Sequence, residues 1–297
     1  MAHEITLSTA TRTNLLSLQN TTGLIGRTQE RLASGLKVNS ALDDALAYFK
    51  ARNLNSRASD LQNIKDTING GVSVIKAAIQ GLDSIESVLK QMKAIAQSAI
   101  SAPESTTRSK LASQFNELRS QVDALAEDSS FNGINLLKNS PAAFQPGADQ
   151  LTVKFNERTE PQAINQLVIS GLRVADYRSI MATSAVIHGT PGNTMVWGQT
   201  GTAAIKAINA ALSAIDSALV SVRQASQQFG TNSSLLQIRA DFTSQIINTL
   251  KGGASDLVNA DMNEESANLL SLQTRQQLGT ISLSIAQKSE EAILRLF

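Results

Sequence analysis

Apolar residues recur every seven positions along a stretch from about residue 54 to residue 99. One row of this repeat consists of Leu54, Leu61, Ile68, Ile75, Leu82, Leu89 and Ala96. A second row follows three positions later and consists of Arg57, Ile64, Gly71, Ala78, Ile85, Met92 and Ala99. The two rows correspond to the a and d positions of a coiled-coil seam, which is imperfect at Arg57 and Gly71. We therefore predict one long helix, ended by Pro103.

A second regular row lies nearer the C-terminus, with Ser226 as its only polar position: Ile205, Ile208, Leu212, Ile215, Leu219, Val222 and Phe229. A shorter stripe between the two rows predicts another helix: Leu111, Phe115, Leu118, Val122 and Leu125. A seam this regular must be buried against another helix, so we expect a long antiparallel coiled-coil bundle, or rod. The residues predicted to carry the rod seam are Leu61, Ile68, Ile75, Leu82, Leu89, Ile205, Ile208, Leu212 and Ile215.

Both ends of the chain also show helical apolar patterns. Near the N-terminus one heptad frame contains Leu15, Leu18, Ile25, Leu32 and Leu36. Near the C-terminus there are two stripes, one with Leu278, Ile281, Ile285 and Ala292, and the other with Leu283, Ala286, Ile293 and Phe297. A helix with two apolar stripes has to be covered on two sides, which a monomer can hardly provide at a chain terminus. The pattern predicts assembly.

The pattern changes between about residues 140 and 202. Alternating apolar residues around Leu151 and Val153, and again around Val168 and Ser170, predict a pair of short strands. A Gly- and Thr-rich segment at 189–201 then predicts a loop, which contains Trp197, the only tryptophan. We expect Trp197 to cover the small β insert, and a ligand platform is the alternative. The fold class is thus mainly α with a small β-containing insert.

The amino-acid composition argues against several classes of function. Aromatic residues make up 4% of the chain against 42% hydrophobic residues, which suits slender packed helices better than a globular enzyme core. The formal net charge of +1 predicts no strong attraction to nucleic acid or an anionic membrane. We expect no membrane span. The chain has no cysteine, and its first residues lack the pattern of a cleavable secretory signal.

Few side chains suggest chemistry. The two histidines, His3 and His188, are far apart and in no metal-ligand spacing. No nucleotide-binding or nucleophile motif occurs. The pair Asp43–Asp44 is better explained by a helix start or a subunit contact than by acid–base catalysis. We predict no catalytic, cofactor-binding or metal-binding residues.

The motifs at the two ends resemble those of bacterial flagellins. The stretch ERLASGLKVNSALDD (30–44) is similar to the N-terminal signature of that family, and FNGINLL (131–137) continues the pattern. The stretch ADMNEESANLLSLQTRQQLGTISLSIAQ (260–287) is similar to the C-terminal signature. The resemblance covers about the first 140 and the last 95 residues.

The resemblance implies a non-enzymatic, extracellular subunit of the flagellar filament. It implies filament-core helices at 1–43 and 257–297, a helical rod at 44–140 and 203–256, and an outer insert at 141–202. It also implies export through the flagellar type III apparatus without a cleaved signal peptide. The partners it implies are other copies of the chain, the hook-associated junction and cap proteins, and an export chaperone on the C-terminal helix.

The chain departs from the family pattern at two places. Leu42 replaces a basic residue, and Tyr48 and Phe49 are added nearby. Two glycines, Gly252 and Gly253, stand where the family continues a helix, which predicts either a hinge or close helix packing. Alternative functions are the hook–filament junction protein and, from another class, a secreted coiled-coil adaptor.

Overall fold

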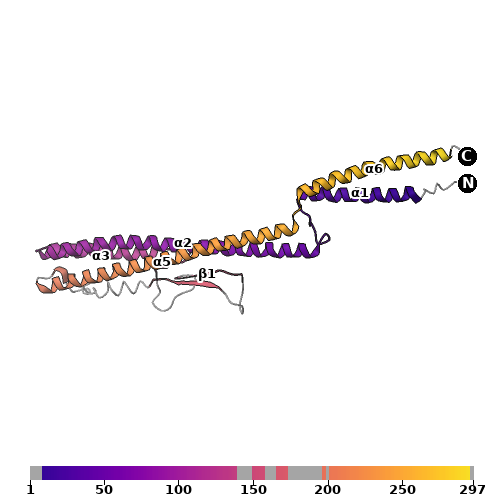
Figure 1. Cartoon of the computed structure of the whole chain (residues 1–297). Coiled ribbons are helices and arrows are strands. Elements are labelled where there is room, and N and C mark those ends of the chain that lie inside the picture. The colour runs from indigo at the N-terminus through magenta and orange to yellow at the C-terminus, as the bar shows by residue number, and fades with distance from the viewer. Residues whose placement is uncertain (1–8, 139–148, 158–164, 173–195, 199–200, 295–297) are drawn as a thin grey trace. The chain divides into compact units, whose positions relative to one another are not determined.

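The computed structural model describes residues 9–138, 149–157, 165–172, 196–198 and 201–294. The long helices are α1 (Thr9–Ser34), α2 (Ala45–Ser101), α3 (Ser105–Asp128), α5 (Thr202–Val258) and α6 (Met262–Leu294). Strands β1 (Gln150–Lys154) and β2 (Gln166–Ser170) and the short 3-10 helix η1 (Val196–Gly198) lie between α3 and α5 in the chain (Figure 1). His3, His188 and Phe297, named above, lie outside the described residues.

The chain forms two compact units. The terminal unit contains Met1–Ala58 and Asn248–Phe297, and the central unit contains Ser59–Ile247. The terminal unit therefore combines the two ends of the chain, and the central unit is one continuous segment. They are described separately below.

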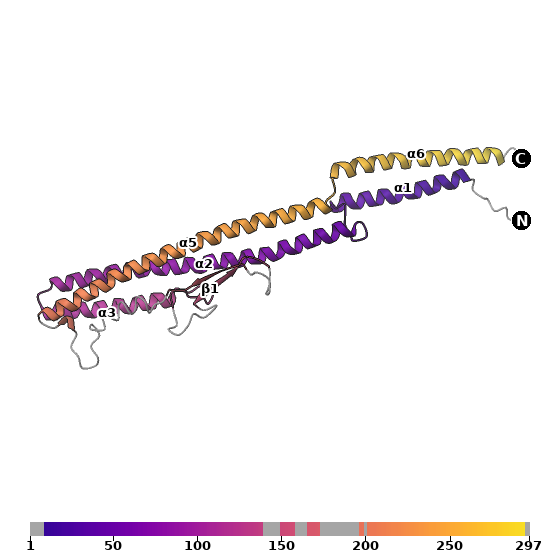
Figure 2. The same ribbon diagram turned by 60° about the horizontal axis from the view of Figure 1, so that its bottom comes forward.

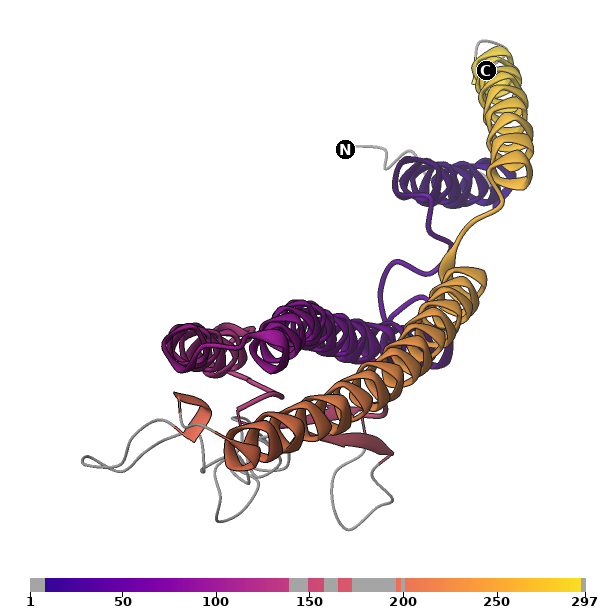
Figure 3. The same cartoon turned by 90° about the vertical axis from the view of Figure 1, so that its left-hand side faces the viewer.

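The central unit is built on α2 and α5, which run antiparallel. Lys65 Nζ donates to Ser244 Oγ at 3.1 Å, and Arg223 Nε donates to Glu86 Oε1 at 3.0 Å. The partner's residue number falls as the α2 number rises, as an antiparallel pair requires. Figures 1 and 3 show α3 and the two strands beside these helices. The predicted antiparallel helical bundle is confirmed.

The predicted α2 rows lie in the core of this unit. Ile68, Ile75, Leu82 and Leu89 are fully buried, and Leu61 is 6% exposed. The second row is also buried from Gly71 to Ala99, whereas Arg57 is exposed. At Gly71 an added Cβ would lie 2.8 Å from Val153 Cγ2 of β1. Because Gly71 has no side chain, β1 can pack closely against α2 at this position.

On α5 one predicted row is correct and the other is correct except at its first residue. Ile208 and Ile215 are buried, Leu219 is 6% exposed and Leu212 packs half-buried against the core, but Ile205 is 47% exposed and does not belong to the seam. A neighbouring row, which the pattern did not indicate, is also buried and consists of Ala204, Ala211, Ala218 and Ala225. Small side chains let helix backbones approach closely, so a row of alanines can face the core while adjacent larger residues stand at its edge.

By length and composition alone, α5 is apolar enough to cross a membrane. Its buried residues, however, belong to the same core cluster as those of α2 and α3. A helix that packs in the core of a bundle is apolar because many of its side chains are buried there, so the composition of α5 is explained without a membrane. The helix also continues through Gly252 and Gly253 without interruption, which argues against a hinge. Close packing does not explain these glycines either, because an added Cβ would meet nothing within 4 Å at Gly252 and only Leu54 at 3.8 Å at Gly253.

The two strands pair antiparallel, with Leu151 opposite Ile169 and Val153 opposite Leu167. The strand pair is confirmed, but the predicted face of β2 is wrong: Val168 is 44% exposed and Ile169 is buried. Apolar residues occupy both faces of β2, so alternation alone does not identify the inner one.

The tryptophan lies against α3, whereas we expected it to cover the strands. Trp197 is fully buried, and its ring centroid is 5.1 Å from that of Phe115. Arg108 Nε donates to the Trp197 carbonyl at 3.0 Å, which fixes η1 on the helix. An element as short as η1 has no periodic pattern of apolar residues, so the sequence does not indicate which helix or strand it packs against.

The FNGINLL segment forms a tight turn at the end of α3. Asn132 and Gly133 both have positive φ angles, 51° and 82°, as a two-residue hairpin turn requires. The Asn135 amide donates to the carbonyls of Ala126 and Glu127 at 2.9 Å, and so satisfies unpaired groups at the helix end. This motif is a helix stop.

Candidate functional site

The candidate site is the pair of helices formed by the two ends of the chain. Helices α1 and α6 run antiparallel side by side (Figure 2). Asn14 Nδ2 donates to Ser282 Oγ and Gln276 Nε2 donates to Thr22 Oγ1, each at 3.5 Å. A Cβ at Gly279 would lie 3.1 Å from Leu18, so the helices are in close contact there. The pairing that the resemblance implies is present.

At the base of this pair the two connecting segments bind each other through their backbones. The Lys37 amide donates to the Val258 carbonyl at 2.7 Å, and the Ala260 amide donates to the Gly35 carbonyl at 2.9 Å. Gly35 itself ends α1 with a φ of 73°. Asp261 then starts α6, since its Oδ1 accepts a hydrogen bond from the Asn263 amide at 2.8 Å. The two signature stretches thus meet in space.

One ion pair joins the same two signatures. Arg31 NH1 and Glu265 Oε1 are 2.9 Å apart, and the Glu265 side chain is 9% exposed. A nearly buried carboxylate requires a partner, because an unpaired one costs several kcal/mol, on the order of 3–5. Arg31 therefore holds the first turn of α6 against α1.

The two adjacent aspartates organise the start of α2. Asp44 Oδ1 accepts from the Ala47 amide at 3.0 Å, which caps the helix. Asp43 Oδ2 accepts from the amides of Ser40 and Asn39 at 3.0 and 3.1 Å. The Ser40 backbone bond is the main cause that lowers the pKa of Asp43 below its usual value. The expected helix-start role is confirmed.

The predicted assembly residues are divided between covered and uncovered positions. Ile25 is buried, and Leu18, Leu32, Leu36 and Leu283 are half-buried. The exposed ones are Leu15 (41%), Leu278 (62%), Ile281 (55%) and Ile285 (63%). The side chain of Ile293 is outside the described set. The structure therefore brings some of these residues together and leaves the others facing outward.

The two stripes of α6 lie on opposite sides of the helix. At about 100° per residue, Leu278, Ile281 and Ile285 fall roughly half a turn from Gly279 and Leu283. The second stripe faces α1, as the contact between Gly279 and Leu18 shows. The first stripe has no cover from α1. We name Leu278, Ile281 and Ile285, with Leu270 at 67% exposure on the same side, the outer stripe.

Sequence reasoning missed two features of this site. The backbone pairing between residues 35–38 and 258–260 has no side-chain pattern, so only the signature motifs could have indicated it. The burial of two polar residues on α1, Thr11 and Thr28, was also missed. Thr11 continues the row of Leu18, Ile25 and Leu32 seven residues earlier, so its position could have been found from the spacing, whereas Thr28 lies outside that frame.

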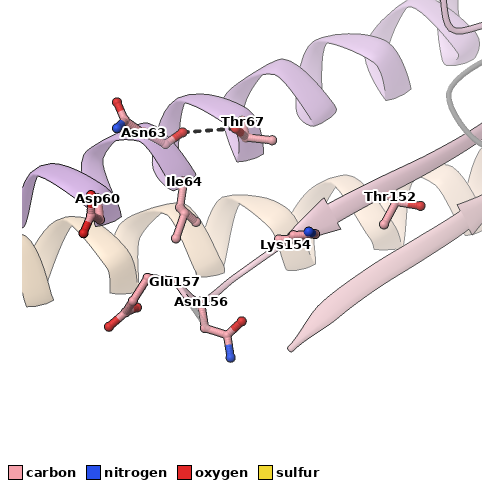
Figure 4. A pocket seen from close by; sticks show the side chains of 8 residues that line it. All are labelled: Asp60, Asn63, Ile64, Thr67, Thr152, Lys154, Asn156 and Glu157. Atoms are coloured by element: carbon pink, nitrogen blue, oxygen red, sulfur yellow. Dashed lines mark hydrogen bonds between the residues drawn. The ribbon is translucent and has the colours of Figure 1, made fainter. Parts of the chain in front are cut away.

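The central unit has a separate open groove between α2 and β1 (Figure 4). Its volume is about 690 Å³, and it is lined by Asp60, Asn63, Ile64, Thr67, Thr152, Lys154, Asn156 and Glu157. Most of these residues are polar, but their apolar atoms contribute more of the groove surface than their polar atoms do, as in most ligand pockets.

Comparisons with known proteins agree with this architecture. Residues 5–142 match the family described as bacterial flagellin N-terminal helical region, and residues 212–297 match the bacterial flagellin C-terminal helical region. The chain is 32% identical over 289 residues to Flagellin FljO of Caulobacter vibrioides, with 95% of each chain covered. It is 28% identical over 300 residues to Flagellin C of Rhizobium meliloti, with 91% of each covered.

A solved structure shares the fold. A Vibrio parahaemolyticus protein assigned as flagellar hook-associated has a TM-score of 0.58 at 17% identity, covering 73% of this chain and 100% of that one. A helical bundle combined with a terminal helix pair, one stripe of which is uncovered, defines a self-assembling structural protein. The chain belongs to the bacterial flagellin family. It is a structural subunit of the flagellar filament, an extracellular polymer of many copies.

Proposed function

We propose that the outer stripe of α6 is the surface through which copies of this chain fold together in the filament core. The observation that carries the proposal is the exposure of Leu278, Ile281 and Ile285 at 55% or more on one side of a helix whose other side is already covered. Burying each such side chain contributes roughly 1.5–3 kcal/mol. A neighbouring copy supplies the missing cover.

The contact is heterologous, with one surface docking onto a different one. Only that geometry propagates into an open helical array, whereas a self-complementary contact closes as a dimer. In this proposal residues 1–43 and 257–297 form the inner layer, residues 44–140 and 203–256 form the rod around it, and residues 141–202 lie outermost. Folding of the terminal helices and assembly are one event, because ordering each residue costs about 1–2 kcal/mol that a lone helix pair does not recover.

The remaining parts of the proposal follow from family membership. The chain does no catalysis. It leaves the cell through the flagellar type III apparatus without cleavage of a signal peptide, and the absence of cysteine in its sequence suits passage as an unfolded chain. Its other partners are the hook-associated junction and cap proteins and an export chaperone that binds the C-terminal helix.

Truncation tests the assembly mechanism. Chains lacking residues 1–35 or 270–297 should keep the helices of the central unit by circular dichroism but fail to extend filament seeds in electron micrographs. Ile281→Asp should block extension while leaving the monomer melting temperature within about 2 °C of the wild type, because an exposed substitution changes stability little. Ile281→Leu, which keeps the apolar surface, is the matched control. Normal filaments from the truncated chains would refute the mechanism.

A further inference from the structure

Two compact groups of exposed apolar side chains lie outside the α1–α6 pair. The first, which we name the entry patch, contains Leu42, Leu46 and Phe49 at the start of α2, with exposures of 98%, 67% and 58%. The second, which we name the α5 stripe, contains Leu235, Ile238 and Phe242, with exposures of 42%, 66% and 54%.

Other large exposed apolar residues on the described parts of α2, α3 and α5 stand apart from one another, among them Ile100, Ile205, Val220 and Leu257. Single exposed apolar residues are normal on protein surfaces. Three within eight residues, each exposed by 42% or more, are a contiguous apolar surface. Outside the α1–α6 pair, the described residues form one such surface in each compact unit.

We propose that the entry patch of one copy packs on the α5 stripe of a second copy in the filament. The proposal rests on self-assembly and adds to the outer stripe a second contact between copies. A polymer that grows by heterologous contacts needs two different surfaces that fit each other. The two groups differ in residues and in compact unit. The α5 stripe spans about two helical turns, roughly 10 Å, and the entry patch consists of Leu42 in the turn before α2 and two residues in the first turns of that helix.

The size of the two surfaces also agrees with a second copy of the chain as the partner. Three side chains a side bury far less than the roughly 800 Å² per partner of a stable isolated complex. The contact is therefore too small to hold two monomers together in solution. In a filament it acts with every other contact of the subunit, and a net charge of +1 gives little repulsion between copies.

Aromatic contact orders part of the entry patch without covering it. The ring of Phe49 packs edge-on to Tyr48 with centroids 5.5 Å apart, and this contact leaves the Phe49 side chain 58% exposed.

Disulfide trapping tests the pairing directly, because the chain has no cysteine of its own. Leu46→Cys chains are copolymerised with Ile238→Cys chains and oxidised. We expect an adduct of two chains in filaments and none in monomers at the same concentration. Val220→Cys is the matched partner, since it is 52% exposed on the same helix. It lies five turns away on the same side, about 27 Å along the axis.

Filaments that form without the adduct would overturn the pairing while leaving self-assembly intact. An equal yield with Val220→Cys, or adducts of Leu46→Cys with itself, would also overturn it. As a second measurement, Leu42→Lys should raise the critical concentration for assembly about tenfold, equivalent to ~1.4 kcal/mol per subunit. Val220→Lys should leave it unchanged. A critical concentration that is unchanged in Leu42→Lys would contradict the proposal.

Discussion

The central and terminal units use similar apolar residues in opposite ways. In the central unit the seam residues Ile68, Ile75 and Leu82 are fully buried against other helices of the same chain. In the terminal unit α6 keeps Leu278 and Ile285 more than 60% exposed. The first unit therefore gains its stability from within the chain, whereas in our proposal the second completes its core only when another copy covers α6. The proposal thus assigns stability to one unit and assembly to the other.

The largest expected effect comes from placing a charge in the core of the central unit. Ile208→Asp buries a carboxylate at a fully buried position and should destabilise the central unit by about 4 kcal/mol. For a unit of this size that corresponds to a loss of about 10 °C in melting temperature, measured by circular dichroism. Ile205→Asp, on the same helix but 47% exposed, is the control and should melt like the wild type. Equal melting temperatures of the two variants would contradict the placement of Ile208 in the seam and of Ile205 outside it.

The alanine row offers a test of how closely α5 approaches the core. Ala218 is fully buried, so Ala218→Leu should overpack the bundle and destabilise it by about 1–3 kcal/mol. Ala210 is exposed on the same helix. Ala210→Leu should leave the free energy of unfolding in denaturant unchanged. A neutral Ala218→Leu would mean that the row faces a space larger than the structure shows.

The ion pair at the base of the terminal unit allows that unit to be weakened without changing the central unit. Glu265→Ala leaves Arg31 without its carboxylate, at a cost of about 1–3 kcal/mol. Because the pair joins only α1 and α6, amide exchange in the first turns of α6 should accelerate in assembled filaments, where the helix pair is folded, while the melting of the central unit in the monomer stays constant. Glu264→Ala, at an exposed neighbouring position, is the control. A fall in the melting of the central unit would show that the units are not energetically separate.

The smallest expected effect concerns pH. Hydrogen bonds from Lys90 and then Arg223 lower the pKa of Glu86 below its usual value. A carboxylate with a depressed folded-state pKa adds stability above its unfolded pKa, about 4.3, and loses it as pH falls through the lower folded value. For this partly exposed pair we expect about 0.2–1 kcal/mol. Glu86→Gln should remove that part of the acid dependence in denaturant titrations, and an unaltered pH profile would contradict it.

Sequence patterns predicted the parts of the fold that rest on large side chains in a regular period. The α2 rows and the d row of α5 are placed correctly for that reason, since Ile208 and Ile215 carry a strong hydrophobic signal. The neighbouring buried row of α5 is made of alanines, whose small side chains carry a weak hydrophobic signal. The more apolar neighbour, Ile205, was therefore chosen in error.

The candidate site was predictable in part. The two stripes of α6 could be read from spacing, but which stripe α1 covers depends on Gly279, a residue without an apolar side chain. The backbone pairing near Leu36 and Asn259 depends on carbonyl and amide groups that every residue has. Such contacts leave no mark in hydrophobic periodicity.

The contacts between α1 and α6 have a consequence for the order of folding. Arg31 and Glu265 are 234 residues apart in sequence, so joining them in an unfolded chain closes a very long loop. Folding of the central unit first brings Lys65 beside Ser244, which shortens the remaining loop to about 55 residues. Two halvings of loop length reduce the entropy of closure by about 1.2 kcal/mol. We therefore expect the pair of α1 and α6 to form after the central unit has folded.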